Sequence, residues 1–185
     1  MPTPRSALLT PSYLGPVQYY TKFLIYDTVY IEVQENYQKQ SYRNRCIILA
    51  ANGKLSLTIP VTKDQPKVLT KDIRIDQTLE WKKRHWTSIE SAYSSSPFFE
   101  FLADDFAPFY EKTYTFLLDI IVELQQLVLK FLEIDATIGI TEEFVRHTDD
   151  ATDDLRDIIH PKKRLRKPDP AFTPAFYYQV FQERY

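Results

Sequence analysis

The stretch "NYQKQSYRNRCIILAANGKLSLTIPV" (residues 36–61) decides the fold, because it places two apolar runs on either side of Asn52 and Gly53. Asn-Gly is typical of a two-residue type I′ turn, in which both central residues take positive φ. The pattern therefore predicts an antiparallel β-hairpin over residues 46–61, with Ala51 opposite Lys54.

The hairpin pairing also predicts which side chains share a face, because side chains alternate between the two faces of a strand. Arg43 and Arg45 then project from one face, one alternation apart. The opposite face is apolar and includes Cys46, which we expect to be buried. Its predicted members are Cys46, Ile48, Leu57 and Ile59.

The rest of the chain alternates between β-type and helical patterns. Strands are expected at residues 6–10, 24–33, 71–76 and 137–140, and helices at 16–23, 78–93, from 97 onward and around 117–131. The last helix is amphipathic and should pack on the sheet. This order predicts an α/β fold in a single domain, with a mixed sheet that contains the hairpin and with flanking helices.

The domain should span residues 1–160. Residues 161–185 form a basic and then proline- and aromatic-rich C-terminal segment that we expect to pack on the same domain. Within it, "KKRLRK" follows a run of aspartates, which favours a solvated or self-paired surface over a nucleic-acid site.

Composition excludes several classes of partner. A net charge of −2 and a pI of about 5.9 provide no basic field for nucleic acid or anionic lipid. The most apolar segment, residues 114–132, is interrupted by charged side chains and does not read as a membrane span. Cys46 is the single cysteine, so no internal disulfide forms, which fits a cytoplasmic location.

No cofactor or metal is expected from the sequence. Gly15, Gly53 and Gly139 are the only glycines and lie far apart, so they cannot build a glycine-rich nucleotide loop. Cys46 and the three histidines occur at no recognised zinc spacing.

The segment before the hairpin contains candidate substrate-binding residues. Arg43 and Arg45 could recognise a carboxylate or phosphate bidentately, with Tyr42 and Asn44 as neutral donors beside them. The alternative is that the arginines form ion pairs with Asp27, Glu32 or Glu35 and only hold the hairpin in place.

A second set of candidates lies outside that segment. His85 could act as a general base, or it could be a buried histidine among aromatic side chains. Tyr13 and Tyr19 flank the carboxyl end of the first strand, where ligands of α/β sheets bind, or they belong to the core. Glu90 shares the helix with His85 and could bind substrate or hydrogen-bond an arginine.

Several motifs resemble, in order, those of the WbqC-like family of bacterial proteins. They are "LLTPSYLGPVQYY", "FLIYDTVYIE", "NYQKQSYRNRCIIL", "LSLTIPV", "HWTSIESAYSSSPFFEFL" and "YYQVFQERY". The resemblance implies a gene context of surface polysaccharide such as O-antigen, and transfer of glycine or another acyl group onto a sugar. The chain departs from the family's usual opening at Thr10 and at residues 12–15.

Two hypotheses about function follow. The first is a cytoplasmic transferase of surface polysaccharide biosynthesis that moves an acyl, aminoacyl (glycine-like) or glycosyl group. The alternative is a non-catalytic module of the same pathway that binds a sugar nucleotide or a protein partner. The ligand of the transferase would be a nucleotide sugar or an acyl donor. We expect the protein to bind neither nucleic acid nor a membrane, and the sequence does not determine its oligomeric state.

Overall fold

The computed structural model describes residues 5–62 and 67–184, and it contains two separate β-sheets and four α-helices. The larger sheet is parallel, with strand order β5-β2-β1-β6. Its strands are β1 (Ser6–Leu9), β2 (Thr28–Ile31), β5 (Thr137–Ile140) and β6 (Thr152–Asp154). The smaller sheet is the antiparallel hairpin of β3 (Arg45–Ala50) and β4 (Gly53–Thr58).

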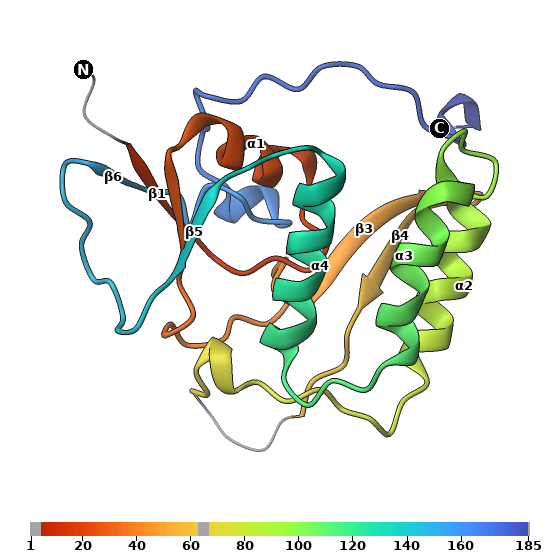
Figure 1. The fold of residues 1–185 in the computed structure, drawn as a ribbon, viewed down its shortest axis with the longest axis horizontal. Helices are drawn as coiled ribbons and strands as arrows, with labels where there is room; N and C mark the ends of the chain where they lie inside the picture. Colours follow the sequence, from red (N-terminus) through yellow and green to blue (C-terminus); the bar gives the residue numbers. More distant parts are fainter. Residues whose placement is uncertain (1–4, 63–66, 185) are drawn as a thin grey trace.

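The helices complete an α/β domain, which confirms the predicted fold class. They are α1 (Val17–Ile25), α2 (Trp81–Tyr93), α3 (Phe99–Glu111) and α4 (Leu117–Phe131), with short 3₁₀ turns η1 (Thr70–Asp72), η2 (Lys163–Leu165) and η3 (Gln182–Arg184). Figure 1 shows the parallel sheet at one end of the molecule, the hairpin with α2 and α3 at the other, and α4 between them. Among the described residues, no helix is long and apolar enough to cross a bilayer.

The hairpin was expected to supply the antiparallel part of one mixed sheet, and in this respect the prediction is wrong. Its apolar face packs against helices, so it contributes to a core of its own. Residues 71–76 also form no strand. Ile75 bridges Val61 whereas Arg74 bridges Phe116, so the segment touches two different partners one residue at a time and builds no ladder.

The hairpin register differs from the predicted one by two residues. Cys46 lies opposite Leu57, and the turn is centred on Ala51 and Asn52. Neither turn residue has positive φ, whereas Gly53 has φ 97°, as in a type I turn followed by a glycine. A shift of two leaves every side chain on its predicted face. Cys46 is accordingly buried, as predicted.

Two apolar cores lie on either side of α4. The hairpin core lies between the hairpin and the helices, whereas the sheet core lies on the helix-covered face of the parallel sheet. The buried first half of α4 belongs to the hairpin core, and Leu129 belongs to the sheet core. The expectation that this helix packs on the sheet is therefore correct for one part of its surface, which includes Leu118, Val128 and Leu129. Main members of the hairpin core are Cys46, Leu57, Ile59, Trp81, Tyr110 and Ile120, and those of the sheet core are Leu9, Phe23, Val29, Ile31 and Leu129.

The C-terminal segment is attached to the domain through a buried ion pair. Lys22 of α1 is fully buried, and its Nζ lies 2.6 Å from Asp169 Oδ2. Gln18 Nε2 donates to the same carboxylate oxygen at 2.7 Å. From there the segment crosses from the sheet side of the molecule to the side of α2 and α3 (Figure 1).

We predict that Asp169→Asn destabilises the fold by about 3 to 5 kcal/mol, because it leaves the Lys22 ammonium buried without a counter-charge. The measurement is the free energy of unfolding from urea denaturation at pH 7. The matched control is Asp157→Asn, whose pair with Lys167 is solvent-exposed and should contribute at most about 1 kcal/mol. Equal effects of the two substitutions would show that the buried pair does not anchor the segment.

Candidate functional site

A polar pocket of about 490 Å³ lies at the carboxyl ends of the parallel strands. Strands β2, β5 and β6 each end beside it, at the edge where ligands of parallel α/β sheets usually bind. Its volume falls in the range of small-molecule sites. The lining consists of amide, carboxylate, guanidinium and aromatic side chains: Gln34, Glu35, Asn36, Gln38, Phe144, Asp154, Arg156 and Asp157.

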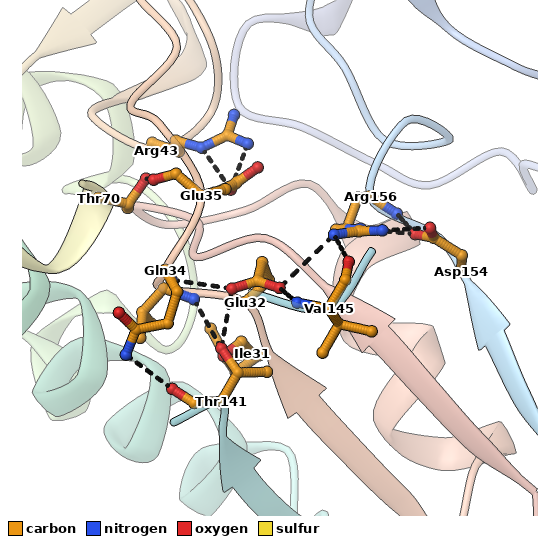
Figure 2. Close-up of polar contacts among 11 residues, drawn as sticks. Ile31, Glu32, Gln34, Glu35, Arg43, Thr70, Thr141, Val145, Asp154 and Arg156 are labelled. Atoms are coloured by element: carbon orange, nitrogen blue, oxygen red, sulfur yellow. Dashed lines mark hydrogen bonds and ion pairs between the residues drawn. The ribbon is translucent and has the colours of Figure 1, made fainter. Parts of the chain in front are cut away.

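Glu32, the residue directly after β2, contacts two residues that line this pocket, Gln34 and Arg156. The carboxylate is fully buried and accepts hydrogen bonds from the Gln34 and Val145 backbone N–H groups at 2.8 and 2.9 Å. It also accepts from Thr141 Oγ1 at 2.9 Å and lies 3.5 Å from Arg156 Nη1. Figure 2 shows these contacts reaching it from three separate segments. Three hydrogen bonds and one ion pair, which involve both carboxylate oxygens, make this buried side chain part of the scaffold.

Arg156 forms one wall of the pocket. Its Nε and Nη2 donate to the two carboxylate oxygens of Asp154, at 2.9 and 2.6 Å, in a bidentate pair. Its Nη1 donates to the Val145 carbonyl, and the guanidinium lies over the ring of Phe144. The hydrogen bonds from Arg156 hold the pKa of Asp154 below its usual range. This wall is therefore ionised and rigid at neutral pH.

Glu35 forms the opposite wall and is only partly satisfied. Arg43 donates to it from Nε, at 2.9 Å, and from Nη2, and both bonds reach the same oxygen, Oε1 (Figure 2). Thr70 N–H and Oγ1 hold the Glu35 carbonyl in place. Burial raises the pKa of Glu35, and Arg43 opposes that shift. Oε2 accepts no hydrogen bond from any described side chain and remains available to a ligand.

His85 and Tyr13, two predicted site residues, are in contact with each other but do not line this pocket. Tyr13 Oη lies 2.9 Å from both His85 Nδ1 and Tyr110 Oη, inside the hairpin core. Trp81 packs edge-on against the imidazole. Burial lowers the pKa of His85 to about 4, so the ring is neutral at pH 7. Burial also raises the pKa of Tyr13 well above its ordinary value.

The remaining predicted site residues are dispersed. Tyr19 is buried in the sheet core and donates to Gln125, Tyr42 is half-buried, and Glu90 is exposed on α2. Asn44 Nδ2 donates to the Ile59 carbonyl at the open end of the hairpin. Arg45 Nε donates to Thr58 Oγ1 across the hairpin.

Among the described residues, no hydrogen bond, ion pair or ring contact joins His85 to either predicted arginine. The structure thus brings only Arg43 to the pocket wall, through Glu35.

Three other cavities lack these features. One, of about 570 Å³, lies between α2 and α3 beside Trp86 and Tyr110. A second, of about 550 Å³, lies between the hairpin and the C-terminal segment beside Ile47 and Phe176. The third, of about 350 Å³, is apolar and lies beside Cys46 and Tyr177. None of them lies at the carboxyl ends of the parallel strands, and within the described residues no cluster of three or more histidine, cysteine or carboxylate side chains could bind a metal.

Comparison with known proteins identifies the family. The family model described as "WbqC-like protein family" matches residues 10–166, which include every wall of the pocket. This chain belongs to the WbqC-like family. It is also 32% identical over 99 residues to the uncharacterized protein Rv1507c of Mycobacterium tuberculosis, and the match covers 53% of this chain and 40% of that protein. No solved structure matches.

Sequence reasoning missed most of the pocket of this WbqC-like protein. Glu32 and Glu35 were considered only as ion-pair partners, Asp154 only as one of the aspartates before the basic run, and Arg156 was not considered. Residues 152–154 in fact form β6, an edge strand with acidic side chains. The usable signal was position, because Glu32 lies near the end of the predicted strand 24–33 and Thr141 follows directly after the predicted strand 137–140.

We predict that Arg43→Ala lowers the free energy of unfolding by about 3 to 5 kcal/mol, because it leaves the buried Glu35 carboxylate unpaired. Arg45→Ala should cost only about 0.5 to 1.5 kcal/mol, the value of one hydrogen bond to Thr58. Chemical denaturation of both variants at pH 7 makes the comparison. A stable Arg43→Ala variant that has lost only ligand affinity would instead support direct anion binding by Arg43.

We further predict a pH dependence of stability that arises from His85. The unfolded imidazole has a pKa near 6.5 and the folded one about 4, so the unfolded state takes up the proton first. The contribution of His85 to the free energy of unfolding is fully present above pH 6.5. It decreases by roughly 3 kcal/mol as the pH is lowered to 4.

The test of this prediction compares denaturation at pH 7 and pH 4 for the parent chain, His85→Gln and His147→Gln. The His85 variant should lose less stability on acidification than the parent. His147 is exposed, so its variant should follow the parent. The pKa of His160 is also lowered, but this residue is present in all three proteins and cancels from the comparison. Identical pH profiles would show that His85 is accessible to protons in the folded state.

Proposed function

We propose that this WbqC-like protein is a transferase that moves an acyl or aminoacyl group onto a hydroxyl of a sugar, in the synthesis of a bacterial surface polysaccharide. The pocket at the sheet end supports the binding part of this proposal, and the family resemblance supports the pathway. The single observation that carries the proposal is the half-satisfied Glu35 carboxylate at the wall of a polar pocket.

The pocket chemistry suits a polyhydroxylated ligand. Gln34, Asn36 and Gln38 offer amide donors and acceptors, and Asp157 adds a carboxylate, which together can bind sugar hydroxyls from several directions. Half-exposed Phe144 offers an apolar surface to the carbon skeleton of the ring. Most small-molecule sites combine an apolar surface with a few oriented polar groups in this way.

Glu35 is positioned to act as the general base. Burial raises its pKa, so the carboxylate is a better proton acceptor than an exposed glutamate. In the proposed reaction Glu35 Oε2 takes the proton from the sugar hydroxyl. At the same time the hydroxyl oxygen of the sugar forms a bond to the acyl carbonyl carbon. The bond from the carbonyl carbon to the donor's leaving group then breaks, and the leaving group takes the proton from Glu35. Arg43 holds the carboxylate in position through Oε1.

His85 was the base predicted from sequence, and that role stays a prediction. Its Nδ1 contacts Tyr13 in the hairpin core, and no described contact links it to the pocket. The two assignments can be separated by experiment, because Glu35→Gln and His85→Gln each remove a base while keeping a side chain that can hydrogen-bond.

We predict that Glu35→Gln lowers the rate of transfer by about a hundredfold or more, the usual contribution of a general base, and changes sugar-nucleotide affinity little. Binding is measured by calorimetry with a panel of nucleotide sugars. Transfer is measured by mass spectrometry after mixing the same sugars with acyl-CoA or aminoacyl donors. Glu100→Gln, an exposed glutamate on α3, is the matched control and should retain full activity.

The same experiment distinguishes the alternatives. Loss of transfer in His85→Gln but not in Glu35→Gln would move the base to the hairpin core. Saturable binding of a nucleotide sugar without product from any donor would favour a non-catalytic binding module. Absence of sugar binding by the folded parent chain would refute the proposed function.

A further inference from the structure

The outer edge of β5 is an unpaired strand edge. Strand β5 pairs only with β2 among the described strands. Thr141 N–H donates to the Ile31 carbonyl, which places the Thr141 backbone groups on the side facing β2. Since backbone groups alternate between the two sides of a strand, the N–H and C=O groups of Ile138 and Ile140 point away from β2. They form a row of donors and acceptors that another strand could complete.

The two edges of the parallel sheet differ in how they are protected. The β6 edge carries acidic side chains, and Asp153 contacts Arg5 and Tyr26. Charges of this kind normally discourage pairing with another chain. The β5 edge carries no charge over residues 137–140, and its two isoleucines are 36% and 49% exposed. Leu132, just before this strand, is 51% exposed.

Acidic residues lie on both sides of this apolar edge. Glu133 and Asp135 precede β5, Glu142 and Glu143 follow it, and all four are exposed. Residues 133–143 contain no lysine or arginine. A second copy of the chain paired antiparallel at this edge would bring the two acidic clusters together, so the flanking charges disfavour self-association.

We propose that the β5 edge binds an extended segment of another protein, with alternating apolar residues flanked by lysine or arginine, as an added strand. The open backbone groups supply the hydrogen bonds of β-augmentation, and the isoleucines contact the apolar side chains of the incoming strand. The flanking carboxylates select basic ends, which attract the partner and fix its position along the edge.

The position of this edge connects it to the pocket. Strand β5 ends at Ile140, and the chain then continues through buried Thr141 to Phe144 in the pocket wall. A bound segment would therefore end beside the pocket mouth. The proposal goes beyond the function suggested above and does not depend on it, because it concerns protein binding and its test contains no sugar and no transfer reaction.

The test uses a fluorescent peptide, Lys-Lys-Thr-Val-Thr-Val-Thr-Lys-Lys, and the full chain in low salt. We expect saturable binding measured by anisotropy, with shifts of the backbone amide signals of residues 137–143 by NMR. The same peptide with glutamates at both ends, or with proline replacing the central threonine, should bind at least tenfold more weakly. Proline removes a donor and a compatible backbone from the added strand.

Variants of the protein test the site itself. Glu142→Lys combined with Glu143→Lys should abolish the preference for the lysine-flanked peptide, because Glu133 and Asp135 then leave one acidic and one basic end at this edge. Asp104→Lys combined with Asp105→Lys, which changes the same net charge on an exposed part of α3, should leave the preference unchanged. Equal effects of the two charge reversals, tight binding of the proline peptide, or no binding of the basic peptide would overturn the proposal. So would a concentration-dependent dimer of the parent chain that Ile138→Lys abolishes.

Discussion

The structure depends on α4, because this helix contributes side chains to both apolar cores. Leu117 and Ile120 pack toward the hairpin, and Leu129, farther along, packs toward the parallel sheet. The hairpin and the parallel sheet share no ladder, so their relative position is set by this helix and the segments around it. A rigid helix with an apolar stripe can connect two cores in this way only if its length and phase match both.

Polar side chains, in contrast, line the pocket beside the carboxyl ends of β2, β5 and β6. Two buried glutamates three residues apart, Glu32 and Glu35, differ there in the number of hydrogen-bond donors that reach them. Glu32 receives donors on both carboxylate oxygens and is part of the scaffold. Glu35 receives all its donors on one oxygen, so the same side chain, at a similar depth, keeps capacity for a ligand. The number of local donors, more than depth of burial, separates a carboxylate bonded at both oxygens from one that can still accept a hydrogen bond.

The sequence was informative wherever a local pattern determined the outcome. Strand alternation predicted that Cys46 is buried, and this held despite a register error of two residues, since the period of a strand is two. Residues 117–131 were predicted correctly as a helix because helical periodicity is also a local pattern. What failed depended on contacts between distant segments. A separate hairpin sheet and a strand in the acidic run each require knowledge of which segments meet. The ion pair of Arg43 with Glu35 was among the predicted alternatives, but the sequence could not decide between it and direct ligand binding for the same reason.

The placement of aromatic residues has a practical consequence. Both tryptophans, Trp81 and Trp86, belong to or pack against the hairpin core. The aromatic residues of the sheet core are tyrosines and a phenylalanine. Indole emission therefore reports on one half of the molecule. If the parallel sheet opened before the hairpin half, the fluorescence signal would stay unchanged while the far-ultraviolet dichroism already declined. Coincidence of the two optical curves is thus a direct measure of whether both halves unfold as one cooperative unit.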